Sequence, residues 1–233
     1  MFWDFLGRRS YEDALGLQLR LREAIRRGEG SEHFLLLEHP HVFTLGRNAR
    51  PEDVLASPAW LLSAEVEVHE CDRGGQVTYH GPGQLVGYPI VNLSPDRRDI
   101  RRFVRDLQEV LIRTLEHYGI VAERREGKDF IGLWVGTAKI ASIGVHLSRW
   151  ISTHGFALNL STDLSFFRGI VPCGLTGVEM TSAEAVSGRR LPLAEVASVC
   201  ARIFAEVFDR DLVRGVRGPA VEAPHRPDVL AVR

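Results

Sequence analysis

The strand-like segments of this chain fall into two groups, and one long amphipathic segment separates them. The first group runs from His33 to Leu93, and the second runs from Phe130 to Leu160. A doubly wound parallel sheet needs a helix between successive strands, and that alternation is missing here. The order of segments therefore predicts an α/β or α+β domain in which helices flank a central mixed β-sheet.

Periodicity and breaker residues place the individual elements. The expected helices span residues 10–27, 96–118 and 193–208, and Ser10 is a suitable N-cap for the first of them. The expected strands span 33–39, 42–45 and 65–71, with two more inside 73–93 that a tight turn at 80–83 joins, and three inside 130–160. Residues 1–212 are expected to form a single domain, and residues 213–233, rich in Pro, Gly, Arg and Val, a flexible tail.

The composition gives no strong net charge that would attract this chain to nucleic acid or to a membrane surface. The formal net charge at pH 7 is −1, and charged residues make up 25% of the 233 residues. No apolar run approaches the roughly 20 residues that span a bilayer, and the first residues lack the basic and apolar regions of a signal peptide. We therefore expect a cytoplasmic protein with reduced thiols.

The three cysteines are far apart and show no C-x-x-C spacing, so neither a disulfide scaffold nor a zinc site is expected. Cys200 falls on the apolar stripe of a helix and Cys71 at the end of a strand, and both positions are typical of packing. Cys173 stands between Pro172 and Gly174, a pair that favours a tight turn with the sulfur presented outward. Cys173 is therefore the candidate nucleophile, provided that a neighbour activates it.

Two further residues stand out inside apolar strand segments. Lys139 lies between Ala138 and Ile140, and the pattern leaves open whether it faces inward or lies on a half-solvated strand face. His154 precedes Gly155 within a strand, which indicates a close backbone approach at that point. The glycine-dense run 73–93 has neither G-x-G-x-x-G nor P-loop spacing, so a dinucleotide or P-loop phosphate site is not indicated.

Taken together, these blocks resemble the lipoyl(octanoyl) transferase family, the octanoyl-[acyl-carrier-protein]:protein N-octanoyltransferases. The matching runs follow the family's order: LLLEHP at 35–40 with TLGR at 44–47, RGGQVTYHGPGQLVGYP at 73–89, KIASIG at 139–144, His154-Gly155 with Ala157 and Asn159, and PCG at 172–174. They cover roughly residues 34–175, and the run RGGQVTYHGPGQ is highly specific.

The resemblance implies the fold of the biotin/lipoate protein ligase catalytic domain. It implies transfer of an octanoyl or lipoyl group from acyl carrier protein to a lysine of lipoyl domains, the first step of protein lipoylation. It implies Cys173 as the nucleophile that carries the acyl group as a thioester, and Lys139 as the residue that depresses the pKa of this thiol. The implied acceptors are the lipoyl domains of 2-oxoacid dehydrogenases and the glycine cleavage H protein, and no cofactor and no metal are implied.

The substrate-binding segments carried over from the family are three, and His154 is expected to support them. Their residues are Arg73, Gly74, Gly75, Gln76, Val77, Thr78, Tyr79, His80, Ser142, Ile143, Gly144, Gly155, Phe156 and Ala157. Within them, Arg73 and His80 are expected to serve the site rather than the fold, although a histidine satisfied by the backbone at the turn is the alternative.

Two other functions stay open at this point. An ATP-dependent lipoate or biotin protein ligase shares the expected fold and needs no nucleophilic cysteine. A non-catalytic lipoyl-domain-binding protein would need neither Cys173 nor Lys139, and both are present. Arg98, Arg102 and Arg105 share one side of the expected helix 96–118, where they form either a solvated face neutralised by aspartates or a contact with the carrier's acidic surface.

Overall fold

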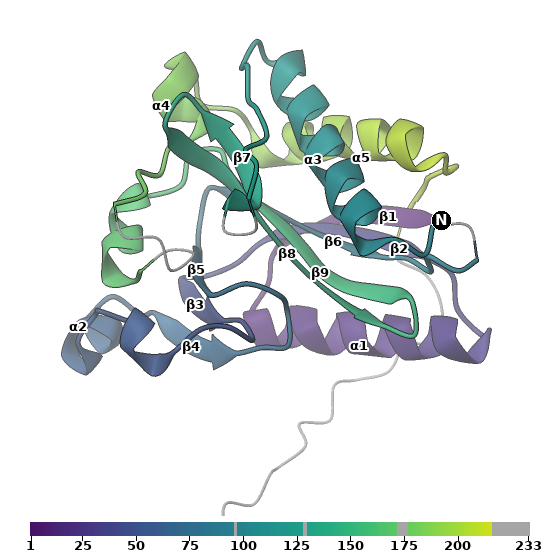
Figure 1. Ribbon diagram of the computed structural model, residues 1–233, viewed down its shortest axis with the longest axis horizontal. Coiled ribbons are helices and arrows are strands. Elements are labelled where there is room, and N and C mark those ends of the chain that lie inside the picture. Colours follow the sequence, from purple (N-terminus) through teal and green to yellow (C-terminus); the bar gives the residue numbers. More distant parts are fainter. Residues whose placement is uncertain (96, 128–129, 172–176, 216–233) are drawn as a thin grey trace, which may run out of the picture.

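The computed structural model describes residues 1–95, 97–127, 130–171 and 177–215. Its centre is a seven-stranded sheet within these residues, with the strand order β10-β1-β2-β6-β9-β8-β7 (Figure 1). Pairing is parallel between β10, β1 and β2 and antiparallel across the rest of the sheet. The predicted central mixed sheet is confirmed. The strands are β1 (Phe2–Arg8), β2 (His33–Glu38), β6 (Gln84–Ile90), β7 (Gly132–Val135), β8 (Ala138–Ser148), β9 (Ile151–Asn159) and β10 (Val213–Arg214).

Helices cover both faces of this sheet. In Figure 1, α3 (Ile100–His117) and α5 (Leu193–Phe208) lie above the sheet, and α1 (Tyr11–Arg27) lies below it. The larger apolar core lies between the sheet and the α3–α5 pair, and a smaller core lies between the sheet and α1.

The helix ends follow from capping chemistry. Ser10 Oγ accepts the backbone N–H of Asp13 at 3.1 Å, and Gly28, at φ 73°, ends α1 where the sequence predicts it. Helix α5 has the predicted bounds. Helix α3 starts at Ile100, four residues later than expected, because the Asp99 carboxylate caps the N–H groups of the next residues.

A second, three-stranded sheet packs beside the first, with the order β4-β3-β5. Its strands are β3 (Val42–Leu45), β4 (Glu67–Glu70) and β5 (Val77–His80). The turn at 80–83 joins two strands as predicted, but β5 and β6 belong to different sheets. A Cβ on Gly81 would lie 1.9 Å from Tyr79 Oη, so the turn requires glycine there. The turn therefore carries the chain from one sheet to the other.

Short helices complete the described residues. They are η1 (Pro51–Asp53), α2 (Pro58–Ser63), η3 (Leu164–Gly169) and α4 (Ala183–Ser187). The tail was predicted to begin at residue 213, but Val213 and Arg214 pair with β1 and belong to the sheet, because their backbone groups extend its edge; residues 216–233 lie outside the described residues. None of the helices described is long and apolar enough to cross a membrane.

Candidate active site

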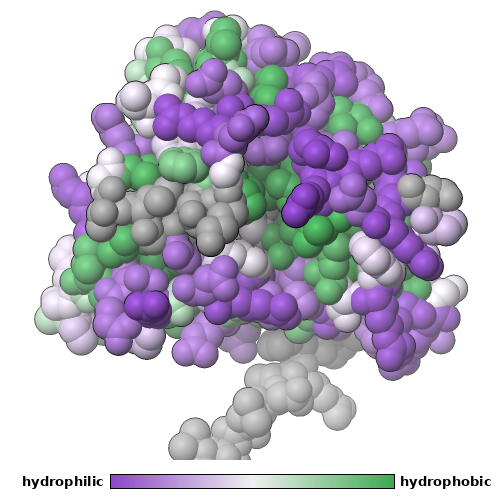
Figure 2. Space-filling model, in the orientation of Figure 1, coloured by the Kyte–Doolittle hydropathy of each residue, from purple (hydrophilic) through white to green (hydrophobic). Residues whose placement is uncertain are grey.

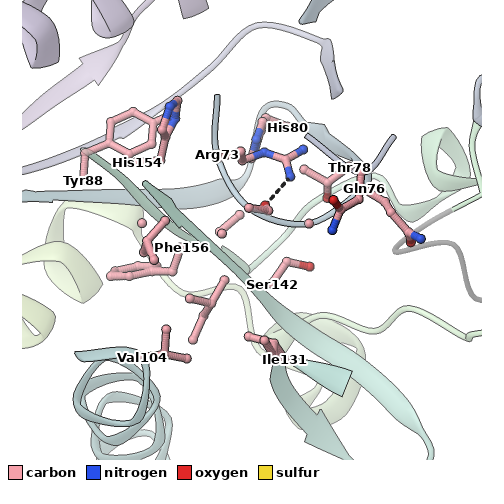
Figure 3. Close-up of a pocket in the computed structure, with 18 of the residues that line it drawn as sticks. Arg73, Gln76, Thr78, His80, Tyr88, Val104, Ile131, Ser142, His154 and Phe156 are labelled. Carbon is pink, nitrogen blue, oxygen red and sulfur yellow. Dashed lines mark hydrogen bonds between the residues drawn. The ribbon is translucent and has the colours of Figure 1, made fainter. Parts of the chain in front are cut away.

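A cavity of about 640 Å³ lies where the edge of the sheet at β8 meets α3 and the segment 73–78. Figure 3 shows Arg73 and His80 on one side of it, Val104 and Ile131 on the other, and Ser142 and Phe156 from the sheet between them. Most of the predicted substrate-binding residues line this cavity: Arg73, Gly74, Gly75, Gln76, Val77, Thr78, His80, Ser142, Ile143, Gly144, Gly155, Phe156 and Ala157. Lys139 and His154 line it as well.

The segment that begins at Arg73 is fixed to the sheet edge by its own backbone. The N–H of Gly74 donates to the carbonyl oxygen of Val145 on β8 at 3.0 Å, and Gly75 adopts φ 88°, a conformation that favours glycine. Arg73 Nη2 donates to the carbonyl oxygen of Thr44 at 2.6 Å and to its Oγ1 at 2.9 Å. The buried Nε of Arg73 has no partner among the described residues, so it is available to an acceptor oxygen of a ligand.

Both ring nitrogens of His80 already have protein partners. Nδ1 bonds Gln84 Oε1 at 2.8 Å, and Nε2 lies 3.4 Å from Thr44 Oγ1, which also accepts from Arg73. Burial, together with nearby His39 and Arg73, holds the pKa of His80 well below its ordinary value. The ring is therefore neutral at pH 7, and its partners are side chains rather than the backbone partner of the alternative stated from the sequence.

The hydrogen bonds that join Thr44, His80 and Gln84 continue across the large sheet. Gln84 Nε2 donates to Asn159 Oδ1 at 2.9 Å, and Asn159 Nδ2 donates to the carbonyl oxygen of Thr181 at 3.0 Å. The N–H of Thr181 in turn donates to the carbonyl oxygen of Lys139 at 2.9 Å. A continuous chain of polar groups therefore runs from Thr44 on the small sheet to Lys139 on the large one.

Lys139 is fully buried, with 1% of its surface exposed. A register shift in the β7–β8 pairing leaves Ile140 without a partner, a bulge of the kind that re-aims side chains. The Lys139 side chain crosses Gly132, where a Cβ would lie 2.7 Å from Lys139 Cε, and its Nζ lies 5.6 Å from the centre of the Trp134 ring. The question that the sequence left open is settled: Lys139 faces inward, onto the cavity wall.

His154 holds the start of the Arg73 segment through a side chain. Its Nε2 bonds Asp72 Oδ1 at 2.7 Å, and His146 Nε2 lies 3.4 Å from the other carboxylate oxygen. The hydrogen bond from His154 lowers the pKa of Asp72 to about 2. His154 adopts φ 59° while buried, a strained conformation for this residue, and Gln18 Oε1 accepts its backbone N–H at 2.7 Å. His154 pairs with Val145 in the sheet. The contacts of His154 with Asp72 and of Val145 with Gly74 therefore hold both residues at the same position along the strands.

Two predicted site residues are not among the described residues that line the cavity, and the other two cysteines have the packing positions predicted for them. The Tyr79 ring packs outside the cavity, stacked on Phe166 at 5.1 Å, and its hydroxyl bonds His41 Nδ1. Cys173 lies outside the described residues. Burial in α5 raises the pKa of the Cys200 thiol to about 12, which suits its predicted core position. Cys71 Sγ donates to the carbonyl oxygen of Leu45 at 3.2 Å, in keeping with the predicted packing role at a strand end.

Sequence reasoning missed several residues of the site. The cavity is also lined by Tyr11, Asn48, Tyr88, Ile100, Arg101, Val104, Ile131 and Val145, and by Arg105, which the sequence had suggested only as a contact with the carrier. The polar residues Thr44, Gln84 and Asn159 carried a usable signal, because a polar side chain inside an apolar strand must find a partner once it is buried. No group of three or more His, Cys, Asp or Glu that could hold a metal ion occurs in the described part of the chain.

Comparison with known proteins decides the family. A family model described as the lipoyl protein ligase A/B catalytic domain matches residues 10–205. The chain belongs to this family. An octanoyltransferase from Solibacter usitatus is 50% identical over 210 residues, which make up 90% of this chain and 94% of that protein. An octanoyltransferase from Alkaliphilus metalliredigens is 44% identical over 212 residues, 91% of this chain and 96% of that protein. The enzyme class predicted from the motifs, an acyltransferase, is confirmed.

The fold of this lipoyl protein ligase A/B catalytic domain is shared with solved structures. The crystal structure of a lipoate-protein ligase A bound with ATP covers 94% of this chain and 91% of its own, with a TM-score of 0.76 and 18% identity. At this identity the likeness shows the fold alone, and it confirms the predicted lipoate ligase-like architecture.

Proposed function

We propose that this chain moves an octanoyl group from a thioester on acyl carrier protein to the ε-amine of a lysine on lipoyl domains, through an acyl thioester on Cys173. The observation that carries the proposal is the buried Lys139 in the wall of a cavity that is large enough for an acyl chain. A lysine ammonium close to a cysteine favours the thiolate over the thiol, and the thiolate is the nucleophilic form.

The first half-reaction forms the acyl-enzyme. The Cys173 thiolate attacks the carbonyl carbon of the donor thioester, the new C–S bond forms, and the bond to the pantetheine sulfur breaks. The pantetheine sulfur leaves as a thiolate and takes a proton from water. The Lys139 ammonium favours the thiolate form of Cys173 before the attack, and the unpartnered Nε of Arg73 donates to an oxygen of the substrate.

The second half-reaction releases the acyl group to the acceptor. The unprotonated lysine amine attacks the acyl carbon, the C–N bond forms, and the bond to Cys173 breaks. The nitrogen loses one proton to water, and Cys173 returns as a thiolate beside Lys139. We propose lipoyl domains of 2-oxoacid dehydrogenases and the glycine cleavage H protein as acceptors, and the cytoplasm as the compartment. The names of the curated octanoyltransferase relatives support the acyl group and the reaction type.

Intact mass spectrometry after incubation with octanoyl-acyl carrier protein tests this proposal. We expect one octanoyl adduct per chain that hydroxylamine removes, that is absent in Cys173→Ala, and that persists in the matched cysteine variants Cys71→Ala and Cys200→Ala. The adduct should form without ATP and Mg²⁺, whereas an ATP-dependent ligase would need both. Adducts that persist in Cys173→Ala, or transfer that depends on ATP, would refute the proposed route.

A further inference from the structure

Side chains from the start of α3 line one side of the cavity, and all but the half-buried Val104 are exposed. Ile100, Arg101, Val104 and Arg105 line this side, and we call these four residues the rim. Their spacing of one and four residues puts them on one face of the first two turns of the helix. Ile100 is 47% exposed, although it is a large apolar residue, and both rim arginines are exposed. The rim therefore combines apolar surface with two accessible positive charges.

The rim arginines differ from their neighbours in their partners. Arg97 pairs with Asp106 at 3.1 Å, and Arg102 approaches the same carboxylate at 3.9 Å. Arg98 donates to Ser94 Oγ. The salt bridges found among the described residues include none to Arg101 or Arg105.

Asp99 offsets the positive charge of the rim only in part. Asp99 Oδ1 accepts the backbone N–H groups of Arg101 and Arg102 as the helix cap, and this carboxylate, whose pKa is lowered, also acts through its negative charge on Arg105 and Arg101. Residues 97–106 carry five arginines against two aspartates. Figure 2 shows hydrophilic side chains over α3 beside a hollow that contains hydrophobic atoms. The rim therefore presents a net positive charge at the mouth of the cavity.

Helix α3 also connects the rim to Lys139. Gln108 Nε2 donates to the carbonyl oxygen of Gly132 at 3.0 Å, and Gly132 is the residue that the Lys139 side chain crosses. Arg101 precedes Gln108 by seven residues, which is about 10 Å along a helix axis, and an extended arginine side chain reaches several Å further. A pantetheine arm has roughly the length of five extended residues, on the order of 17 Å. A thioester held at Lys139 would therefore bring the far end of its arm to the rim.

We propose that Arg101 and Arg105 bind the phosphodiester of the phosphopantetheine arm by which acyl carrier protein presents the octanoyl thioester. Guanidinium groups one turn apart on a helix bracket a single phosphate, and each makes charge-assisted hydrogen bonds to it. Ile100 and Val104 then cover the apolar part of the arm. This inference rests on the proposed function. It replaces two of the three arginines that the sequence suggested, because Arg98 and Arg102 do not line the cavity.

The test compares three donors of the same octanoyl group: octanoyl-acyl carrier protein, octanoyl-coenzyme A, and octanoyl-N-acetylcysteamine, which lacks the phosphate. The variants are Arg101→Ala, Arg105→Ala and their double, with Arg98→Ala as the control of equal charge that lies just before α3 and does not line the cavity. We expect the double variant to raise the KM for octanoyl-acyl carrier protein at least tenfold. The loss with octanoyl-N-acetylcysteamine should be at least fivefold smaller, and Arg98→Ala should follow the wild type with every donor.

The outcomes separate the possible explanations. An equal loss with the phosphate-free donor, or an equal loss in Arg98→Ala, would overturn the inference, since the rim would then act through stability or through general charge. A loss with the carrier but not with octanoyl-coenzyme A would also overturn it, because the arginines would then contact the carrier protein and not the arm. If the wild-type chain took octanoyl from none of the three donors, the proposed function itself would fail.

Discussion

The inner wall of the cavity and the rim are built in opposite ways. On the inner wall, Arg73, His80 and Lys139 are buried, and a chain of hydrogen bonds joins their neighbourhoods across two sheets. At the rim, Arg101 and Arg105 are exposed and make no ion pair in the described part of the chain. The side chains of the inner wall are held by protein partners before any substrate binds, whereas the rim arginines are free to take their partners from a bound substrate.

This difference suits a reaction with two large partners in turn. Both half-reactions of the proposed route take place at the same acyl carbon, so the groups around it gain from being held in one arrangement. In the proposed reaction the donor and the acceptor are different proteins that use the same mouth in succession, so side chains there gain from being accessible. Substitutions on the inner wall should therefore reduce stability and activity together, and substitutions at the rim should change mainly KM.

The largest effect is expected at Gly132. This residue has φ 142°, and a Cβ would lie 2.2 Å from the carbonyl oxygen of Ala141, so Gly132→Ala should lower the free energy of unfolding by about 3 kcal/mol or more. The control is Gly136→Ala, at φ 55° with nothing within 4 Å of its Cβ, which should cost only about 1–2 kcal/mol. Urea unfolding of both variants measures the difference. Equal losses of unfolding free energy in the two variants would mean that Gly132 is not tightly packed against Lys139 and Ala141.

A smaller loss is expected when the polar chain is cut at Thr44. Thr44→Val keeps the shape but removes the hydroxyl that accepts from Arg73 and lies beside His80 Nε2. Leaving these buried groups unpaired should lower the free energy of unfolding by about 1–3 kcal/mol and reduce kcat. Thr44→Ser restores the hydroxyl and should restore both quantities. A Thr44→Val variant that matches wild type in chemical denaturation and in kcat would show that the chain of hydrogen bonds fixes nothing.

The next prediction concerns pH and Asp72. Because the folded-state pKa of Asp72 is lowered from 3.8 to about 2, its contribution to stability is present above pH ~4 and is lost as the pH falls from about 4 to 2. The wild type should therefore be more stable than Asp72→Asn at pH 6, and the difference should shrink below pH 4. Chemical denaturation at pH 6 and pH 3 gives the two differences. A constant difference would show that the His154–Asp72 bond does not set this pKa.

The smallest effect on stability is expected at the rim. Ile100 is half exposed, so Ile100→Ala should change the free energy of unfolding by no more than about 0.5 kcal/mol. If this side chain covers the apolar part of the donor arm, the loss of that cover should raise the KM for octanoyl-acyl carrier protein about threefold. Thermal denaturation and steady-state kinetics supply the two values. A large loss of stability would remove the contrast between the rim and the inner wall.

The sequence predicts the regular parts of this fold well, because its signals there are local. Helix α5 matches its predicted bounds, and α1 starts and ends at the predicted cap and glycine. Strand β1 was missed because Asp4 and Gly7 interrupt its alternation, and its pairing with β2 and β10 joins residues far apart in the chain. The strands of the second sheet were predicted, but their separation from the central sheet was not, because strand pairing joins residues far apart in the chain.

In the site, too, the sequence predicts features that have local signals and misses those that depend on tertiary packing. Glycine-rich runs and family motifs indicate the residues of segment 73–80 that line the cavity, but the outward turn of Tyr79 depends on the aromatic cluster around it. The inward direction of Lys139 depends on a bulge at Ile140, which no local pattern reveals. Of the three arginines that the sequence placed on one side of the expected helix, only Arg105 lines the cavity, and the sequence pattern alone does not show this because it depends on the packing of α3.

The central claim is that the fixed inner wall holds Lys139 where it activates the thiol of Cys173. The most direct measurement is the pH dependence of iodoacetamide labelling at Cys173, followed by peptide mass spectrometry, in wild type and in Lys139→Met. Methionine preserves the stem that crosses Gly132 and removes the charge. The labelling of Cys71 in the same samples is the internal control and should have one profile in both proteins. The account predicts that the Cys173 profile moves to higher pH in Lys139→Met by about 1–3 pH units. Superimposable Cys173 profiles would contradict it.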